Sequence, residues 1–371
     1  MHYLHSTRLP RQGLLVSMLC ALLLAPLVFA QEQHTRPRRV EVEEIEGAAI
    51  RVNTELVSVD VLVSDRTGQK NAPRLAAEEF VVYEDGKRQE VANFSAAEVP
   101  FSLVLLLDVS GSASRDLSLI RQAAIRFLQE LRPQDRVAIV TFHKDVEQLI
   151  NLTDDRKELE NALTLLPSGT GSAVYDGLET AITQTLGKIE GRKAVISLTD
   201  GVDSYGAATY EKLLPLIERS SAMLYFLEVD TQGFTETGMA RECTDRDHFE
   251  FSEKQLKKYF IPLGKKGPLY ERHCILDQQE RRLVNRALYA AAHQEMQTMA
   301  EKTGGLVYPV KSLEQLEPAF SRIAAELRTL YSLAYYPTND KHDGTWRKLR
   351  VEVRRKGWAV RARPGYRAPK G

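Results

Sequence analysis

The chain has 371 residues, of which 43% are hydrophobic and 27% are charged, and its formal net charge is zero. These values are typical of a globular protein, and no excess of positive charge points to nucleic acid. The length predicts two domains or one elaborated domain.

Residues 1–30 are predicted to be a signal peptide. Arg8 and Arg11 precede the uncharged stretch "GLLVSMLCALLLAPLVF", and residues 28–30 have the small-x-Ala pattern of a cleavage site. The alternative is a retained anchor, for which the apolar stretch is borderline in length. Cleavage predicts an exported protein, periplasmic or extracellular, with no stable membrane span.

The mature chain would keep two cysteines, Cys243 and Cys274, in one polar segment. An even pair in an oxidising compartment predicts a disulfide. Their spacing is poor evidence for zinc.

The segments before residue 101 predict a linker and then strands. Residues 31–50 are charged and aperiodic, which indicates a linker, whereas "VSVDVLV" (57–63) alternates as a half-buried strand does. In "FVVYEDGKRQEVANF" (80–94), two apolar runs flank Asp85-Gly86, a strong hairpin signal. We therefore assign 51–100 to a β domain.

Residues 101–330 predict a doubly wound α/β domain with a mostly parallel, six-stranded sheet. Strand-like runs at 103–107, 136–142, 193–199, 222–229 and 305–310 alternate with helical patterns, and 146–150 predicts a hairpin edge. Strands that alternate with helices imply right-handed crossovers and a sheet covered on both faces.

Short strands return in residues 331–371. Residues 41–100 carry 13 acids and 6 bases, whereas 341–371 carry 11 bases and 2 acids. Neither piece has enough strands to be stable alone, so we expect the two to form one β domain beside the α/β domain. The alternative is that the basic tail contacts an anionic surface.

Two carboxylates follow buried strands of the α/β domain. "LVLLLDVSGS" places Asp108, Ser110 and Ser112 after one strand, and "KAVISLTDG" places Asp200 after its predicted neighbour. Ligands of open α/β sheets gather at the carboxyl ends of the strands, where the strand order reverses. Hard oxygen donors without His or Cys suit Mg²⁺, with Mn²⁺ or Ca²⁺ as competitors.

"DVSGS", "GTGSAVYD" and "LTDG", in this order, resemble the metal-ion-dependent adhesion site (MIDAS) of von Willebrand factor type A (VWA) domains. The flanking segments further resemble a bacterial exported family of VWFA-related proteins. The resemblance implies a Rossmann-like VWA domain over 101–330 and metal ligation by Asp108, Ser110, Ser112 and Asp200, at least one aspartate acting through water. A third loop supplies another hydroxyl: Ser172, or alternatively Thr170, because VWA families commonly place Thr before "ALYD".

Helix capping could explain each of these residues singly, but it does not explain why two acids and three hydroxyls are expected at the same edge of the sheet. Asp176 and Asp203 are interpreted as local helix and loop groups, and His143 as a rim residue.

Three classes of function are compatible with this sequence. The first is a metal-dependent module that binds an acidic residue of a protein partner; the others are a metal-independent envelope scaffold and a metal-assisted hydrolase. The chain has no G-x-S-x-G, Walker A or H-E-x-x-H motif, so we expect no enzyme.

Residues 231–280 form an insertion where a short loop would suffice. It leaves the sheet at the edge that carries Asp108 and Asp200. Its scattered aromatic residues are expected to be too few for a separate core. We hypothesise that the insertion, closed by the cysteine pair, forms one wall of the partner site; the alternative is a decorative surface loop.

Overall fold

The computed structural model describes residues 56–65, 74–96, 99–112, 117–239, 251–260 and 276–370. All of them belong to one compact unit, Asn53–Gly371. The predicted signal peptide (1–30), the linker (31–50) and both Cys243 and Cys274 lie outside the described residues. Among the helices within these ranges, none has the length and apolar character needed to cross a membrane.

A six-stranded sheet forms the centre of the α/β domain, in the order β10-β9-β8-β5-β6-β7. All neighbouring pairs are parallel except β6 with β7, which is antiparallel. This confirms the predicted sheet with its hairpin edge. The strands are β5 (Phe101–Asp108), β6 (Arg136–Phe142), β7 (Val146–Thr153), β8 (Arg192–Thr199), β9 (Met223–Val229) and β10 (Val307–Val310).

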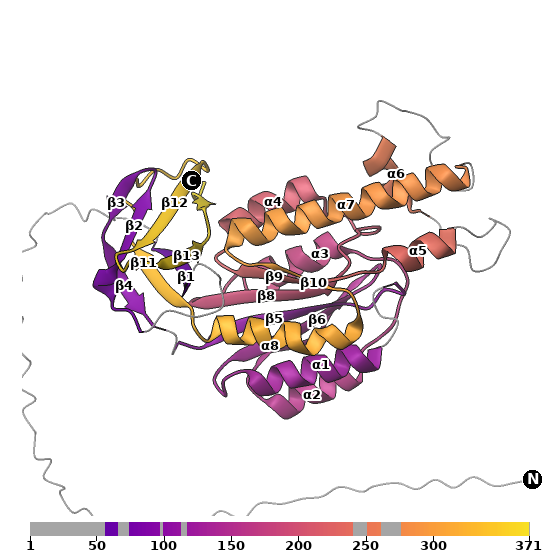
Figure 1. The fold of residues 1–371 in the computed structure, drawn as a ribbon, viewed down its shortest axis with the longest axis horizontal. Helices are drawn as coiled ribbons and strands as arrows, with labels where there is room; N and C mark the ends of the chain where they lie inside the picture. The colour runs from indigo at the N-terminus through magenta and orange to yellow at the C-terminus, as the bar shows by residue number, and fades with distance from the viewer. Residues whose placement is uncertain are drawn as a thin grey trace, which may run out of the picture. The chain divides into compact units, whose positions relative to one another are not determined.

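Helices cover both faces of the sheet (Figure 1). One face carries α1 (Leu117–Glu130), α2 (Arg156–Thr164) and α8 (Leu316–Leu327); the other carries α3 (Val174–Glu179), α4 (Tyr210–Arg219) and α7 (Gln278–Thr303). A π-helical segment, Thr180–Thr185, continues α3, and a 3₁₀ turn, Leu313–Gln315, precedes α8.

Strand β5 shows why the sheet is buried on both sides. Leu103 and Leu105 pack into one core cluster, whereas Val104 and Leu106 pack into the other. Side chains of a strand alternate between faces, so an uninterrupted apolar run supplies both cores.

Segments from both ends of the described chain form the β domain, as the sequence predicts. One sheet has the order β13-β1-β11-β4 and the other β14-β12-β2-β3. Each therefore joins strands that precede the α/β domain to strands that follow it. The strands are β1 (Val57–Asp65), β2 (Phe80–Glu84), β3 (Lys87–Gln89), β4 (Val91–Ser95), β11 (Tyr331–Tyr335), β12 (Trp346–Val353), β13 (Trp358–Ala362) and β14 (Gly365–Arg367).

The β domain has its own core and its own charge pairing. Val59, Val82 and Leu333 are buried in one cluster. Glu79 lies in the 3₁₀ turn Ala77–Glu79 before β2 and forms an ion pair with Arg355 at 2.7 Å. This ion pair joins the acidic N-terminal segment of the β domain to its basic C-terminal segment. The turn of the predicted hairpin joins β2 to β3, and Asp85 and Gly86 have positive φ values of 47° and 83° there. The second apolar run forms β4, which pairs with β11 in the other sheet and not with β2.

The insertion contains two helices that the sequence did not predict, α5 (Gln232–Met239) and α6 (Glu253–Phe260). The aromatic residues of the insertion do not form a separate core in its described part. Phe251, Leu256 and Phe260 form a small cluster with Val284 and Leu288 of α7. The long helix α7 supplies the apolar surface that the insertion lacks, and the insertion is anchored there.

Candidate metal centre

Asp108 and Asp200 lie at the ends of two adjacent strands. Asp108 ends β5 and Asp200 directly follows β8, and these strands pair in parallel with Leu107 opposite Leu198. Both carboxylates are buried, with exposed fractions of 0% and 4%. Two acidic groups at the same buried edge must be stabilised by hydrogen bonds or by a cation.

Hydrogen bonds hold both oxygens of Asp108. Its Oδ1 accepts from the backbone N–H of Ser110 at 3.0 Å. Its Oδ2 accepts from Thr199 Oγ1 at 2.7 Å and from Ser172 Oγ at 3.2 Å. The predicted hydroxyl of the third loop therefore reaches the carboxylate of the first strand.

The carboxylate of Asp200 accepts hydrogen bonds from four different segments of the chain. Its Oδ2 accepts from Thr231 Oγ1 at 2.5 Å, from Ser112 Oγ at 3.3 Å and from the hydroxyl of Tyr289 at 3.4 Å. Its Oδ1 accepts from the backbone N–H of Val202 at 3.0 Å. The loop after β5 is thus joined directly to the loop after β8.

The hydroxyls of Ser110 and Ser112 lie 3.4 Å apart, as their spacing along one loop suggests. A backbone bridge pairs Ser110 with Gly169, and the N–H of Gly169 donates to Val109 at 3.0 Å. The glycine-rich loop (residues 169–172) is therefore held against the serine loop (residues 110–112).

Ser172 and Thr170 lie differently on that glycine-rich loop. Ser172 is buried and hydrogen-bonds Asp108, whereas Thr170 is exposed at the rim of the same cavity. Gly171, between them, has a φ of 73°, and a Cβ there would lie 2.3 Å from the ring of Tyr205. This close approach and the left-handed backbone explain the glycine at this position.

The two carboxylates of the site lie close together, and their pKa values reflect this. Burial, and after it the charge of Asp200, raises the pKa of Asp108 to about 7. Burial also raises the pKa of Asp200. Within the described ranges, no Lys, Arg or His forms an ion pair with either carboxylate.

This set of donors fits a divalent cation that prefers oxygen. Asp108, Asp200, Ser110, Ser112 and Ser172 offer carboxylate and hydroxyl oxygens, which are ligands of Mg²⁺, Mn²⁺ and Ca²⁺. Among the described residues there is no group of three or more His, Cys, Asp or Glu side chains that could hold a metal. A cation held here would be coordinated by the hydroxyls together with the two carboxylates.

Asp176 and Asp203 have hydrogen-bond and ion-pair partners on other segments of the domain. Asp176 Oδ1 accepts from the backbone N–H of Ala207 at 3.1 Å. Asp203 accepts from the N–H of Tyr175 at 3.3 Å and pairs with Lys254 of α6 at 2.5 Å.

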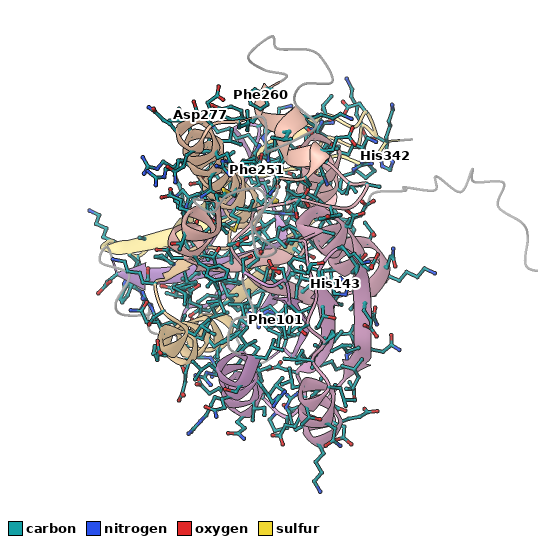
Figure 2. All side chains as sticks on the ribbon, turned by 90° about the vertical axis from the view of Figure 1, so that its right-hand side faces the viewer. Phe101, His143, Phe251, Phe260, Asp277 and His342 are labelled. Carbon is teal, nitrogen blue, oxygen red and sulfur yellow. The ribbon has the colours of Figure 1, made fainter. Side chains whose placement is uncertain are left out.

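A cavity of about 520 Å³ opens beside the two carboxylates. The serine loop and the glycine-rich loop form one side; Phe234 and Met239 of α5, Phe251 and Gln255 of the α6 region, and Tyr289 of α7 are on the other. Figure 2 looks onto this edge, with Phe251 above and His143 below the centre of the view. The insertion therefore borders the candidate metal centre.

Helix α6 is fastened to the α/β body by two lysines. Besides its ion pair with Asp203, Lys254 donates to the carbonyl of Ala208 at 2.8 Å. Lys258 donates to the hydroxyl of Tyr175 at 2.7 Å and pairs with Glu295 of α7 at 2.7 Å. These contacts fix the position of the cavity wall.

Thr199, Thr231 and Tyr289 were not among the predicted site residues. Thr199 precedes Asp200 in "LTDG", so its position at the strand end is a usable signal. Thr231 and Tyr289 lie 31 and 89 positions from Asp200, and no local pattern marks them.

The family comparison agrees with this fold and these loops. Residues 103–202, which contain the serine loop, the glycine-rich loop and Asp200, match the family described as von Willebrand factor type A domain. The chain contains a VWA domain. No curated protein matches the chain.

Three of the solved structures that are similar to this chain are the following. BatB from Bacteroides thetaiotaomicron is 18% identical, with a TM-score of 0.38, over 62% of this chain and 98% of its own. A von Willebrand factor type A protein from Catenulispora acidiphila is 10% identical, with a TM-score of 0.41, over 85% and 74%. Proximal thread matrix protein 1 from the mussel byssus, with a zinc-occupied MIDAS motif, is 14% identical, with a TM-score of 0.40, over 66% and 49%.

Proposed function

We propose that this VWA domain is a metal-dependent binding module for a protein partner. Asp108, Ser110, Ser112, Ser172 and Asp200 would hold one divalent cation, with Mg²⁺ in physiological use. When bound, the cation supplies a coordination position for a carboxylate oxygen of the partner.

One observation carries this proposal: two buried carboxylates share one site, and no basic side chain among the described residues forms an ion pair with either of them. Charged groups inside a protein are normally paired or coordinated to metal, because burial without a partner is costly. The hydroxyls that surround Asp108 and Asp200 stabilise the charge only in part, since both pKa values remain raised. A cation bound by Asp108 and Asp200 would balance their remaining negative charge.

The cavity beside the centre supports a partner with an acidic residue next to an apolar one. Phe234 and Tyr205 line the cavity and keep 39% and 48% of their surface exposed. Partly exposed aromatic side chains in a concave site are typical of recognition surfaces. In this proposal the insertion supplies the apolar contact and sets specificity.

We further propose that the domain binds and does not catalyse, and that it acts outside the cytoplasm. At the described site the serine hydroxyls contact carboxylates or one another, an arrangement suited to holding a cation. Residues 1–30 carry the pattern of a signal peptide, which supports export to the periplasm or the extracellular space.

Calorimetry on the mature chain tests the metal site. We expect Mg²⁺ and Mn²⁺ to bind with one-to-one stoichiometry to the wild type, and Asp108→Asn to weaken binding by at least about tenfold, because a charged ligand is lost. Asp145→Asn is the matched control, since Asp145 is a well-exposed carboxylate on a neighbouring loop. Equal affinity of Asp108→Asn and the wild type would contradict the assignment.

Capture of partners from the native envelope then tests the function. Binding that is lost in chelator and restored by Mg²⁺ supports the proposal. Binding that persists unchanged in chelator would instead identify a metal-independent scaffold.

A further inference from the structure

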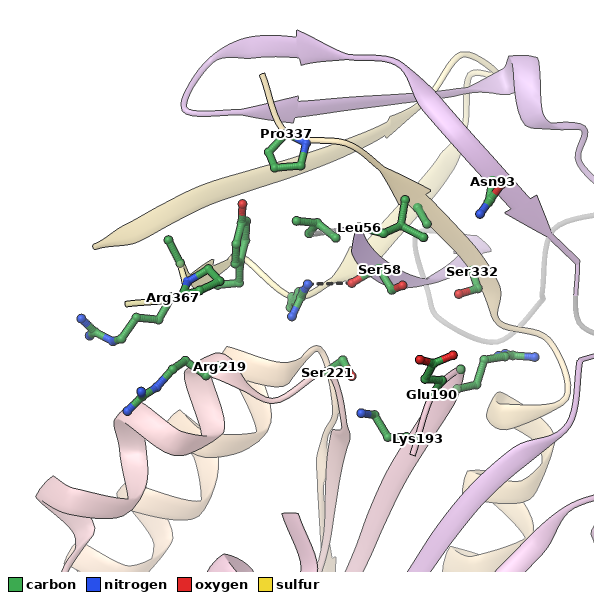
Figure 3. A pocket seen from close by; sticks show the side chains of 18 of the residues that line it. Leu56, Ser58, Asn93, Glu190, Lys193, Arg219, Ser221, Ser332, Pro337 and Arg367 are labelled. Atoms are coloured by element: carbon green, nitrogen blue, oxygen red, sulfur yellow. Dashed lines mark hydrogen bonds between the residues drawn. The ribbon is translucent and has the colours of Figure 1, made fainter. Parts of the chain in front are cut away.

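A second and larger cavity lies at the opposite edge of the central sheet. It has a volume of about 840 Å³ and lies between the β domain and the loops that lead into β8 and β9 (Figure 3). Arg192, at the start of β8, lines it, whereas Asp200 follows the end of the same strand. The two cavities are therefore separate sites.

Basic side chains predominate in the wall of this cavity. Its acidic lining residues are Glu190 and Asp340, both exposed. Its Lys and Arg lining residues are Arg192, Lys193, Arg219, Lys341, Arg363 and Arg367.

Two of these cations already have carboxylate partners. Arg192 lies 3.8 Å from Asp60, and Arg367 pairs with Glu218 at 2.6 Å. The other four face Glu190 and Asp340, and the charge of Asp60 also acts on Lys193 and Arg363. Among the described residues, these six cations are matched by four carboxylates, Asp60, Glu190, Glu218 and Asp340, so the cavity keeps an excess of positive charge.

Arg363 is the most deeply placed of the four. Its Nη2 donates to the carbonyl of Ser58 at 2.6 Å and its Nη1 to the carbonyl of Ser220 at 3.4 Å. Its Nε is buried and has no hydrogen-bond partner among the described residues. Carbonyl oxygens accept hydrogen bonds but do not neutralise the guanidinium charge, and the one buried carboxylate that acts on it, Asp60, is shared with Arg192 and Lys193. Arg363 therefore keeps a donor that no described residue engages and a charge that is only partly balanced.

Lys193 shares this environment. It is half-buried, and its Nζ donates to the carbonyl of Ile189 at 2.9 Å. Burial and the charge of Arg363 lower the pKa of Lys193. Burial likewise lowers the pKa of Arg363. Two like charges near each other in a partly buried site favour an anion between them.

We propose that this cavity is a binding site for a small organic oxyanion, a carboxylate or a phosphate, held by Lys193 and Arg363. Ammonium and guanidinium groups form strong, charge-assisted hydrogen bonds with such oxygens. The hydroxyl of Ser221 and the amide of Asn93 also line the cavity and can bind the rest of the ligand (Figure 3). A volume of this size matches that of small-molecule sites.

Titration of the mature chain tests this site at constant ionic strength. Inorganic phosphate and citrate are the two probes, and binding is followed by calorimetry and by the backbone amide signals of residues 189–193. We expect saturable binding of at least one probe: phosphate alone indicates a phosphorylated ligand, and citrate alone indicates a carboxylic acid.

Variants of Lys193 show whether the binding is specific. We expect Lys193→Gln to weaken binding by about tenfold, because one charge-assisted contact is lost. Lys193→Arg, which keeps the charge, should retain binding. Lys212→Gln, on the exposed surface of α4, should leave it unchanged. Absence of saturation for both probes, or equal losses in Lys193→Gln and Lys212→Gln, would overturn the proposal.

Discussion

The hydroxyl of Tyr289 lies 3.4 Å from Oδ2 of Asp200. The same hydroxyl lies 2.7 Å from Oγ1 of Thr231, which itself donates to Asp200 at 2.5 Å. Burial and the charge of Asp200 raise the pKa of Tyr289, so the phenol remains a protonated donor. Helix α7 is thereby joined to the candidate metal centre by a short chain of hydrogen bonds.

Tyr289→Phe should therefore weaken cation binding without abolishing it. Loss of groups that orient metal ligands commonly reduces affinity by about tenfold to a hundredfold, and we expect the lower end because Thr231 still holds Asp200. Calorimetry with Mn²⁺ measures the change. Tyr205→Phe is the control, since Tyr205 lines the same cavity from the opposite loop. Unchanged affinity in Tyr289→Phe would show that α7 has no influence on the site.

Phe234→Ala should reduce partner capture and leave cation affinity unchanged. Phe234 is a partly exposed aromatic residue in the wall of the cavity and is distinct from the five proposed ligands. Truncation of an aromatic anchor commonly costs about 2 kcal/mol or more of binding free energy. Leu283→Ala is the matched control, because Leu283 is 51% exposed on α7 and does not line the cavity. If both variants capture the partner as well as the wild type does, the insertion does not contribute to partner binding.

Arg192→Met should destabilise the whole protein. The guanidinium donates to the carbonyls of Val99 at 3.1 Å and Leu330 at 3.0 Å, on the two segments that connect the domains, and it lies beside buried Asp60 of β1. Removing one partner of a buried pair costs about 3–5 kcal/mol, because the other charge is left uncompensated.

Urea denaturation measures this loss, and the double variant with Asp60→Asn isolates the pair. We expect the double variant to be less destabilised than the sum of the two single variants, as for residues that interact directly. Additive losses would show that Asp60 and Arg192 do not stabilise each other.

The pH dependence of stability should change when Asp203 is replaced by Asn. Burial raises the pKa of Asp203 to about 6, and the contact with Lys254 offsets this only in part. Between the ordinary value of 3.8 and about 6, the folded state binds a proton that the unfolded state has released. The contribution of Asp203 to stability is therefore fully present below pH 3.8, the pKa in the unfolded state, and is lost as pH rises through about 6, the pKa in the folded state.

Chemical denaturation at several pH values between 4 and 7, in the presence of chelator, measures this difference. The advantage of the wild type over Asp203→Asn should fall by about 1–3 kcal/mol across the window, since each unit of pKa shift corresponds to about 1.4 kcal/mol. A difference that is constant or that grows with pH would contradict the raised pKa.

Local patterns in the sequence were sufficient for the strands of the α/β domain and for the polar residues at their ends. The apolar run of β5 stops at Asp108, and the corresponding run of β8 stops before Asp200. Parallel strands place their carboxyl ends at one edge, so the proximity of these residues follows from the βαβ pattern alone. The turn at Asp85-Gly86 could also be predicted from the sequence, because left-handed backbone angles require particular residue types.

The tertiary structure decided everything that depends on contacts between distant segments. Thr231 and Tyr289 hydrogen-bond Asp200 although they lie 31 and 89 positions away in the sequence. Lys254 and Lys258 hold α6 against residues of α3, α7 and the loop after β8. The same holds for the basic cavity between Lys193 and Arg363. Hydrogen bonds and ion pairs of this kind leave no periodicity in the chain, since their partners are chosen by packing. The sequence by itself determined the frame of this VWA domain and the residues at its strand ends, whereas packing alone determined what surrounds them.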